Sequence, residues 1–343
     1  MKKTLFTLAL CMLLVSFIFA CGSDDDDDDD NDDIVDDDIV DDDVVDDDAT
    51  PDDDDTVDDD DVTPDDDDSI DDDSVDDDDD TPGGPLNLTV MTYNVLFAFP
   101  DPEYDSWRVR KTHVAEIINF HDADLVGMQE PFSWQVDDLL ELCPGYVVHR
   151  LELHTDSALF YREDRFDVLD SGHFWHSPWP YVPFSIGFGN FFARNVLWVK
   201  LYDHQSGKEF YFFNTHFDNT SPFQENAAPQ FLDLMEEIIG ESPVVVTGDF
   251  NSKPDTEAYR ILTEGNTVGG FALTNSFDLV DEFDVRLTPG DERVYDPDHR
   301  IDHIFFAQGD WDCTYWVVDM SRYGDPWRDP SDHLAMAADL VLE

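Results

Sequence analysis

The sequence predicts an α/β domain over residues 86–343. Short apolar runs typical of strands alternate along this part of the chain with apolar residues at helical spacing. Several predicted strands also end in a polar or acidic residue, which is expected when a site lies at the edge of a sheet. The length allows one large domain or two ordinary ones, and we predict one, because the pattern shows no second folded unit.

The elements are predicted in order from the spacing of apolar residues. Strands are predicted at residues 88–94, 124–130, 146–150, 157–161, 196–201, 209–217, 244–246, 300–306 and 333–341. Helices are predicted around Val114, Leu139, Phe231 and Ala258. Residues 265–299 are rich in Gly and Asp, show little periodicity and predict a loop.

The stretch 244–256 joins a predicted strand to a predicted helix. The valines at 244–246 predict a strand buried on both faces, and Ser252 is the expected N-cap of the helix. Asp249 and Asn251 follow the end of this strand, and in extended chain both would point the same way. A carboxylate that binds a metal or takes a proton, beside an amide, suits phosphate-ester chemistry. The alternative is an ordinary Asp-Phe-Asn turn.

Residues 1–21 have the pattern of an export signal. Lys2 and Lys3 precede an apolar stretch at 5–20 that is short for a membrane-spanning helix and ends in a small residue. The last four residues, Ile-Phe-Ala-Cys, resemble the lipobox of bacterial lipoproteins, which implies that Cys21 is lipidated. No acidic residue follows Cys21 directly, so we expect an exported lipoprotein at the outer membrane or cell surface. The alternatives are an ordinary cleaved signal and an uncleaved anchor.

Residues 22–85 are predicted to be a disordered linker. Within them, residues 24–80 hold 38 Asp among 57 positions and no Lys or Arg. Such a segment buries too little apolar surface to offset its ordering entropy, and its like charges keep it extended. A Ca²⁺-loaded coil is the alternative, although carboxylates without organised geometry bind Ca²⁺ weakly.

The folded part is acidic in its own right. The chain has 83 acidic and 18 basic residues, and residues 81–343 retain 45 acidic and 16 basic residues, a formal charge of −29. Because proteins that bind long nucleic acids carry a basic face, non-specific binding to duplex DNA is disfavoured. We expect a monomer. The sequence leaves open whether Cys143 and Cys313 form a disulfide or remain buried thiols.

Polar side chains follow five predicted strand ends. They are Asn94, Glu130, His216, Asp249 with Asn251, and Asp302 with the Ser331-Asp332-His333 segment. Each fragment is weak by itself, because Gln-Glu and Ser-Asp-His are common by chance. The set is specific, because the fragments occur in one order and each lies at the end of a predicted strand.

These motifs resemble those of the endonuclease/exonuclease/phosphatase superfamily, which includes deoxyribonucleases, apurinic endonucleases, inositol polyphosphate 5-phosphatases and bacterial sphingomyelinases. The resemblance extends from Leu88 to Leu342, and residues 160–172 look like those of a bacterial branch of uncharacterised hydrolases. It implies a four-layer sandwich, in which two facing mixed β-sheets are flanked by helices and the site lies at one edge. It also implies metal-assisted attack of water on a phosphodiester or phosphomonoester.

The resemblance further implies a metal site. Glu130 would be the principal Mg²⁺ ligand, as a hard oxygen for a hard cation, with Asn94 beside it. Asp332 would complete the site. Mn²⁺ or Ca²⁺ could replace Mg²⁺.

The remaining residues of the set would act on water and phosphate. Asp249 would orient or deprotonate the attacking water, and Asn251 would hold a phosphate oxygen. His333 would contact the phosphate, with Asp302 fixing its tautomer and raising its pKa. His216 would hydrogen-bond the phosphate from the other side.

Two positions depart from the pattern of the family. Apurinic endonucleases have an acid two residues after the asparagine, where this chain has Leu96, so a second metal ligand is missing. Residues 294–299 replace a stretch that precedes the late Asp in close relatives, which puts substrate contacts there in doubt.

Other residues have two readings each. Arg194 could bind a substrate anion or form a structural ion pair, and Asp218 could support His216 or cap the next segment; we carry both as substrate-binding candidates. The histidines expected to shape loops or surface are His173, His176, His299 and His303. The aromatic residues at 175–192 suit core packing or an apolar rim for a lipid or nucleobase.

We therefore predict a lipid-anchored, Mg²⁺-dependent phosphoric ester hydrolase that acts outside the cytoplasm. Its substrate would be a nucleic acid or nucleotide, a phospholipid, or a sugar or inositol phosphate. The rival hypothesis is a surface binding module that kept the fold without catalysis. The complete acid, amide and histidine set favours the enzyme, because a binding role does not need all of it.

Overall fold

The structure is a computed structural model that describes residues 83–152, 154–266 and 270–343, apart from the side chains of His154 and Thr155. The predicted export signal, Cys21 and residues 22–82 of the predicted linker lie outside the described residues. Among the described residues, no helix is both long and apolar enough to span a membrane.

Helices interrupt the strands mainly in the first two thirds of the domain. The strands are β1 (Leu86–Asn94), β2 (Leu125–Gln129), β3 (Tyr146–Leu151), β4 (His154–Arg162), β5 (Phe166–Trp175), β6 (Asn195–Asp203), β7 (Glu209–His216), β8 (Val244–Asp249), β9 (Thr274–Asn275), β10 (Asp284–Leu287), β11 (Asp302–Ala307), β12 (Trp311–Met320) and β13 (Ala335–Leu342). The helices are α2 (Trp107–His121), α3 (Ser133–Leu142), α4 (Ser221–Ile239) and α5 (Glu257–Glu264), with 3₁₀ turns η1 (Ser276–Leu279) and η2 (Pro297–His299).

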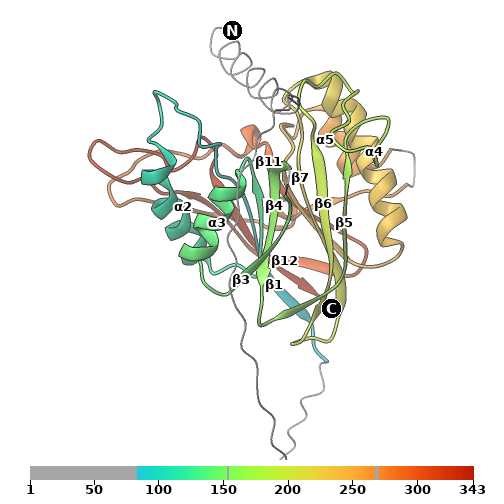
Figure 1. The fold of residues 1–343 in the computed structure, drawn as a ribbon. Coiled ribbons are helices and arrows are strands. Elements are labelled where there is room, and N and C mark those ends of the chain that lie inside the picture. Colours follow the sequence, from blue (N-terminus) through green and yellow to red (C-terminus); the bar gives the residue numbers. More distant parts are fainter. Residues whose placement is uncertain (1–82, 153, 267–269) are drawn as a thin grey trace, which may run out of the picture. The chain divides into compact units, whose positions relative to one another are not determined.

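The strands form two mixed sheets that face each other (Figure 1). The first sheet has the order β10-β12-β13-β1-β2-β4-β3, and the second has the order β5-β6-β7-β8-β11-β9. Helices α2 and α3 cover the outer face of the first sheet, and α4 and α5 cover that of the second. The predicted four-layer α/β sandwich is therefore confirmed.

Three apolar cores separate the four layers. The core between the sheets includes Leu88, Leu125, Val199, Phe212 and Val245. Val114 and Leu139 of the first helix pair pack against Met91 and Val126. Phe231 and Leu262 of the second pair pack against Phe213 and Val246. Because the two central strand pairs bury both faces, their sequences are nearly continuous apolar runs.

On each central strand, alternate residues face the opposite sheet, and each row changes from apolar to polar toward one edge. The rows are Val90-Thr92-Asn94 on β1, Leu125-Gly127-Gln129 on β2, Phe212-Asn214-His216 on β7 and Val245-Thr247-Asp249 on β8. The polar ends of all four rows are buried, so each polar group needs a partner there.

Asn214 supplies that partner between the sheets. Its Oδ1 accepts hydrogen bonds from Gln129 Nε2 at 2.7 Å and from Thr247 Oγ1 at 3.0 Å. Its Nδ2 donates to the carbonyl oxygens of Met128 at 2.7 Å and Ala158 at 3.1 Å. One fully buried amide of the second sheet thus binds two strands of the first.

Gly127 lets the sheets approach at this point. A Cβ atom there would lie 1.9 Å from Thr247 Oγ1 and 2.6 Å from Asn214 Oδ1, distances that no side chain tolerates. The glycine is required by close packing, since its φ is not in the left-handed region.

Several predicted details are wrong. Residues 265–299 contain β9, η1, β10 and η2 in addition to loop, and the sequence analysis missed β5 and β12. Thr256, rather than Ser252, is the N-cap of α5, with its Oγ1 accepting from Tyr259 N at 3.3 Å. Asn251 has a φ of 48°, so it does not continue the extended chain beside Asp249. A left-handed residue turns the chain immediately after the strand, and Asn tolerates that conformation better than most.

Cys143 and Cys313 are free, buried thiols in two different cores. Burial raises the pKa of each thiol to about 12. They therefore pack as small apolar side chains.

His176 and His303, which were expected to shape loops or surface, are both buried, and His303 lies in β11. His303 Nε2 lies 2.8 Å from the carbonyl oxygen of Ser252, and its Nδ1 lies 3.0 Å from Asn275 Nδ2, which fits a neutral ring protonated on Nε2. His176 Nε2 lies 2.8 Å from Thr215 Oγ1. Burial lowers the pKa of both rings to about 3.

Replacing Asn214 with Ala should destabilise the domain by roughly 2–4 kcal/mol, because several buried groups lose their partner at once. The free energy of unfolding in urea measures this. Asn119→Ala is the matched control, since this exposed amide makes one bond, to the carbonyl oxygen of Leu142. The control should change stability by less than about 0.5 kcal/mol. Equal effects of the two changes would contradict a bridging role for Asn214.

The His176→Gln variant should be less sensitive to acid than the unchanged protein. Since the folded-state pKa of His176 is lowered, the unfolded chain binds its proton more readily, and stability falls as the pH drops below about 6.5. The variant should escape up to about 1.4 kcal/mol of this loss per pH unit. Urea unfolding between pH 7 and pH 4.5 measures the difference, and exposed His204→Gln is the control. Parallel pH profiles would show that His176 is not buried in its neutral form.

Candidate active site

Strand register brings the predicted residues to one edge of the sandwich. β1 and β2 are parallel with Asn94 opposite Gln129, so Asn94 and Glu130 end neighbouring strands. β7 and β8 are parallel with His216 opposite Asp249. β11 runs antiparallel to β8 and places Asp302 opposite Asp249. Residues that are far apart in the sequence thus meet at the carboxyl ends of β1, β2, β7 and β8.

Asp249 lies at the centre of the cluster. Its Oδ2 accepts from Asn94 Nδ2 at 3.1 Å and lies 3.4 Å from His216 Nε2 and 3.6 Å from His333 Nε2. Its Oδ1 accepts from the backbone N–H of Asn251 at 2.9 Å. This buried carboxylate oxygen therefore lies near two imidazoles.

Each imidazole has a carboxylate behind it. His333 Nδ1 lies 2.8 Å from Asp302 Oδ2. Burial lowers the pKa of His333, but the charges of Asp302 and Asp249 outweigh burial and raise it well above its usual value. These two carboxylates therefore favour the protonated form of His333. Burial also raises the pKa of Asp302 to about 6, and its Oδ1 has no hydrogen-bond partner among the described residues.

Asp156 is the second such carboxylate, and the sequence analysis missed it. Its Oδ1 lies 3.1 Å from His216 Nδ1, and both of its oxygens lie 2.7 Å from Arg194 Nη1. Burial and Arg194 lower the pKa of His216, whereas Asp156 and Asp249 raise it. The two carboxylates outweigh the lowering effects, so the pKa of His216 lies above its usual value. In the sequence Asp156 directly precedes the strand predicted at 157–161, but its place at the edge where β2 ends follows from the antiparallel pairing of β4 with β2.

Arg194 therefore lies inside the cluster as part of an ion pair. Its Nη1 also lies 2.8 Å from His216 Nδ1, and its Nε has no partner among the described residues. Burial lowers the pKa of Arg194, but Asp156, Glu130 and Asp218 raise it. The buried carboxylate of Asp218 makes no hydrogen bond to His216 in the described part of the chain, and Thr220 is the N-cap of α4.

Glu130 follows β2 on a strained backbone. Its φ is 64°, and Leu96 on the facing loop has a φ of 60°. Glu130 Oε2 accepts from the backbone N–H of Phe97 at 3.3 Å, and Oε1 lies 4.0 Å from His216 Nε2. Burial raises the pKa of Glu130, as does Asp332. A half-buried carboxylate of this kind gains from a nearby cation.

The segment before β13 is fixed by two residues that the sequence analysis did not use. Ser331 Oγ donates to the carbonyl oxygen of Asn94 at 2.6 Å. Buried Arg110 donates from Nη1 to the carbonyl oxygens of Val95 at 2.8 Å and Pro330 at 2.7 Å. These bonds place His333 against Asp249 and leave Asp332 exposed beside it.

The described residues include one tight group of possible metal ligands. Single ligand atoms of Asp249, Asp302 and His333 all lie within 4.8 Å of one another. The predicted ligands Asn94, Glu130 and Asp332 lie around the same edge and are not members of this group. Carboxylate oxygens of both sets suit a hard divalent cation.

Asn251 lies at the rim of the cluster, with its Nδ2 donating to the carbonyl oxygen of Phe217 at 2.9 Å. His173 and His299 are exposed and lie outside the cluster.

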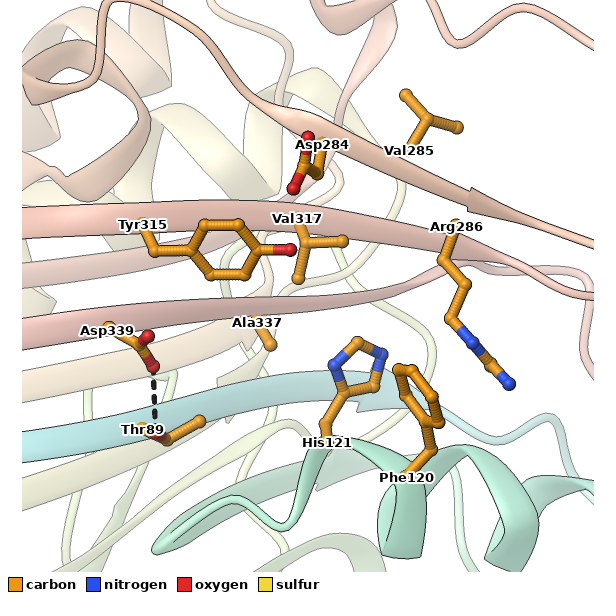
Figure 2. Close-up of a pocket in the computed structure, with 10 residues that line it drawn as sticks. All are labelled: Thr89, Phe120, His121, Asp284, Val285, Arg286, Tyr315, Val317, Ala337 and Asp339. Atoms are coloured by element: carbon orange, nitrogen blue, oxygen red, sulfur yellow. Dashed lines mark hydrogen bonds between the residues drawn. The ribbon is translucent and has the colours of Figure 1, made fainter.

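A separate cavity of about 370 Å³ lies on the outer face of the first sheet, beside the end of α2 (Figure 2). Two of its lining side chains are already paired, since His121 and Arg286 contact Asp319 at 2.9 Å and 2.5 Å.

Comparison with known proteins identifies the family. The chain is 28% identical to an endonuclease/exonuclease/phosphatase family protein of Bacteroides thetaiotaomicron, with a TM-score of 0.66 and coverage of 76% of this chain and 99% of that one. It is 29% identical to a mannosyl-6-phosphatase of the same organism, with a TM-score of 0.65 and coverage of 74% and 100%. An uncharacterised protein of Acanthamoeba polyphaga mimivirus is 23% identical over 64% of this chain and 87% of its own length. The family model described as Endonuclease/Exonuclease/phosphatase family matches residues 91–333, and the chain belongs to that family.

Proposed function

We propose that this protein is a divalent-metal-dependent hydrolase of phosphate esters. The observation that carries the proposal is the arrangement around Asp249, whose Oδ2 faces the Nε2 atoms of His216 and His333. Each imidazole is backed by its own carboxylate, Asp156 or Asp302. A surface binding module would not need two such pairs to converge on one acid.

The charges around the cluster fit a divalent cation. Five carboxylates of the proposed metal and reaction residues meet at this edge: Glu130, Asp156, Asp249, Asp302 and Asp332. The groups that can carry positive charge beside them are Arg194 and the two imidazoles. We propose that Glu130 holds Mg²⁺ with Asn94 and Asp332 beside it, because the Glu130 carboxylate is half-buried with a raised pKa. A bound divalent cation would neutralise charge on the phosphate oxygens and polarise the phosphorus centre. Mn²⁺ or Ca²⁺ would fit the same oxygens.

The residues around Asp249 have separate roles in the proposed reaction. Asp249 orients the attacking water and accepts its proton as the water oxygen bonds to phosphorus and the bond to the leaving oxygen breaks. His333, held as a cation by Asp302, binds the phosphate from one side, and His216 binds it from the other. These groups are fixed before substrate arrives, so little reorganisation is needed as charge develops.

Arg194 within the cluster and Asn251 at its rim would contribute to phosphate binding. Asp218 would act on the substrate only through its electrostatic effect on Arg194. The substrate class we propose is a phosphate mono- or diester of a nucleotide, a phospholipid or a sugar. Similarity to a mannosyl-6-phosphatase supports a sugar phosphate. The formal charge of −29 argues against duplex DNA.

We also propose that the protein is monomeric and works outside the cytoplasm, anchored through a lipidated Cys21 at the outer membrane or cell surface. The pattern of residues 1–21 supports this location, and the Asp-rich residues 22–85 would act as a spacer.

Asp249→Ala and His333→Ala should each lower kcat/KM for an aryl phosphate ester by roughly 10²–10⁴-fold, because each removes a group that acts on the transferred proton or the phosphate. Steady-state kinetics with mono- and diester probes measures the loss. His204→Ala is the control, since this exposed histidine lies outside the cluster. Circular dichroism and thermal unfolding check that each variant folds. Near-normal turnover in a folded Asp249 variant would refute the assigned role.

Removal of divalent ions with a chelator should abolish turnover, and Mg²⁺ should restore it. Glu130→Gln should weaken Mn²⁺ binding at least about tenfold by electron paramagnetic resonance titration, since it removes a charged ligand. Asp302→Asn should leave that affinity within about threefold, because its carboxylate is committed to His333. A tenfold loss of Mn²⁺ affinity in Asp302→Asn with little change in Glu130→Gln would instead assign the metal to Asp249, Asp302 and His333. Chelator-resistant turnover would exclude metal dependence.

A further inference from the structure

The long loop at 176–194, between β5 and β6, begins and ends at the active-site edge. Trp175 is opposite Asn195 in the sheet, and Val196 is opposite Thr215, the residue before His216. At its end, Arg194 contacts His216 directly. The loop therefore flanks the entrance to the cluster on the side of the second sheet.

This loop exposes an unusual number of large apolar side chains. Trp179, Tyr181 and Phe191 are 60%, 68% and 64% exposed. Val182, Phe184 and Ile186 are also exposed. Of the 15 large apolar residues that are exposed among those described, these six lie within 13 consecutive positions. A concentration of this kind marks a surface that binds something apolar.

The same stretch is free of negative charge in a very acidic domain. Asp170 and Asp203 are consecutive acidic residues, and none lies between them. The only basic side chains in that interval are Arg194, which is paired with Asp156, and Lys200, which is paired with Glu209. The exposed part of the loop is thus electrically neutral, whereas the rest of residues 81–343 carries the charge of −29.

Residues 177–187 of this loop satisfy most of their own backbone donors. Pro178, Pro180 and Pro183 have no N–H group. The backbone N–H groups of Ser177, Trp179, Val182 and Ser185 bond within the loop or to β5, for example Trp179 N to Ser177 Oγ at 3.0 Å. Ser177 Oγ and Ser185 Oγ lie 2.6 Å apart. A segment with few free donors loses little hydrogen bonding when it leaves water, which is a condition for entering lipid.

We propose that residues 177–193 dock the active-site edge onto the surface of a zwitterionic lipid bilayer. Trp and Tyr side chains prefer the interface between headgroups and acyl chains, where an apolar ring and a polar tip are both satisfied. The neutral loop fits such a surface, whereas the acidic domain is repelled by anionic lipids. A lipidated Cys21 would keep the domain near a membrane, and 61 residues between Cys21 and Gly83 span at most roughly 200 Å.

The test compares three forms of the full chain that all carry Cys21→Ser, so that no acyl chain contributes. The loop variant adds Trp179→Ser, Tyr181→Ser and Phe191→Ser. The matched control adds Phe120→Ser, Leu169→Ser and Tyr315→Ser, which removes three exposed apolar side chains elsewhere. Co-sedimentation with phosphatidylcholine vesicles gives the bound fraction. Quenching by brominated phosphatidylcholine reports whether Trp179 enters the bilayer.

We expect the parent and the control to bind the vesicles alike and the loop variant to bind at least tenfold more weakly. Quenching of tryptophan fluorescence by brominated phosphatidylcholine should be weaker in a Trp179→Phe variant than in the parent. Adding phosphatidylserine to the vesicles should not strengthen binding. Equal vesicle binding by the parent and the loop variant would refute the proposal. The proposal would also be refuted if the parent did not bind vesicles but formed dimers through the loop, which size-exclusion chromatography would detect. Vesicle binding needs no turnover, so this result stands apart from the proposed hydrolase activity.

Discussion

The contact on which the rest depends is the buried amide of Asn214 between the two sheets. It binds Gln129 and Thr247 and two main-chain carbonyl groups, and it lies two residues before His216. Gln129 precedes Glu130, and Thr247 lies two residues before Asp249. Because residues two apart on a strand share a face, fixing this layer fixes the next layer toward the edge. The active site is held in register by the polar layer beneath it.

That layer also explains why acidic groups can lie so close together at the edge. Each buried imidazole is held between two carboxylates, so its positive charge offsets part of the repulsion between them. Asp249 is shared by both imidazoles, which leaves Asp302 and Asp156 to fix the outer nitrogens. Glu130 lies farther away, at 4.0 Å from His216, and among the described residues it accepts one backbone hydrogen bond, from Phe97. Its charge is less compensated than that of Asp156, Asp249 or Asp302, which makes it a candidate for binding a cation.

The sequence predicted the fold class and the central strand ends, because these strands are apolar runs that stop at polar residues. Asp249, His216 and Asn94 could be found in this way. Asp156 could not be found by the same rule, since it lies near the start of its strand and its importance depends on the antiparallel pairing of β4 with β2. β5 was missed because most of its middle is solvent-exposed and lacks an apolar run. Asn251 was misplaced because one left-handed residue reverses the direction that an extended chain would take. Long-range register and single backbone dihedrals are not visible in local patterns.

The distribution of charge limits what can reach the cluster. A polyanion approaching residues 81–343 meets a net negative field, whereas the cations of the site are already paired with carboxylates at short range. At physiological salt, screening confines the repulsion to distances of about 8–10 Å. A small phosphate ester therefore meets few repulsive charges, whereas a long polyanion meets many. The neutral loop at 177–193 adds no further negative charge at the edge. Substrates carrying an apolar group beside the phosphate are therefore the ones for which both parts of this surface are favourable.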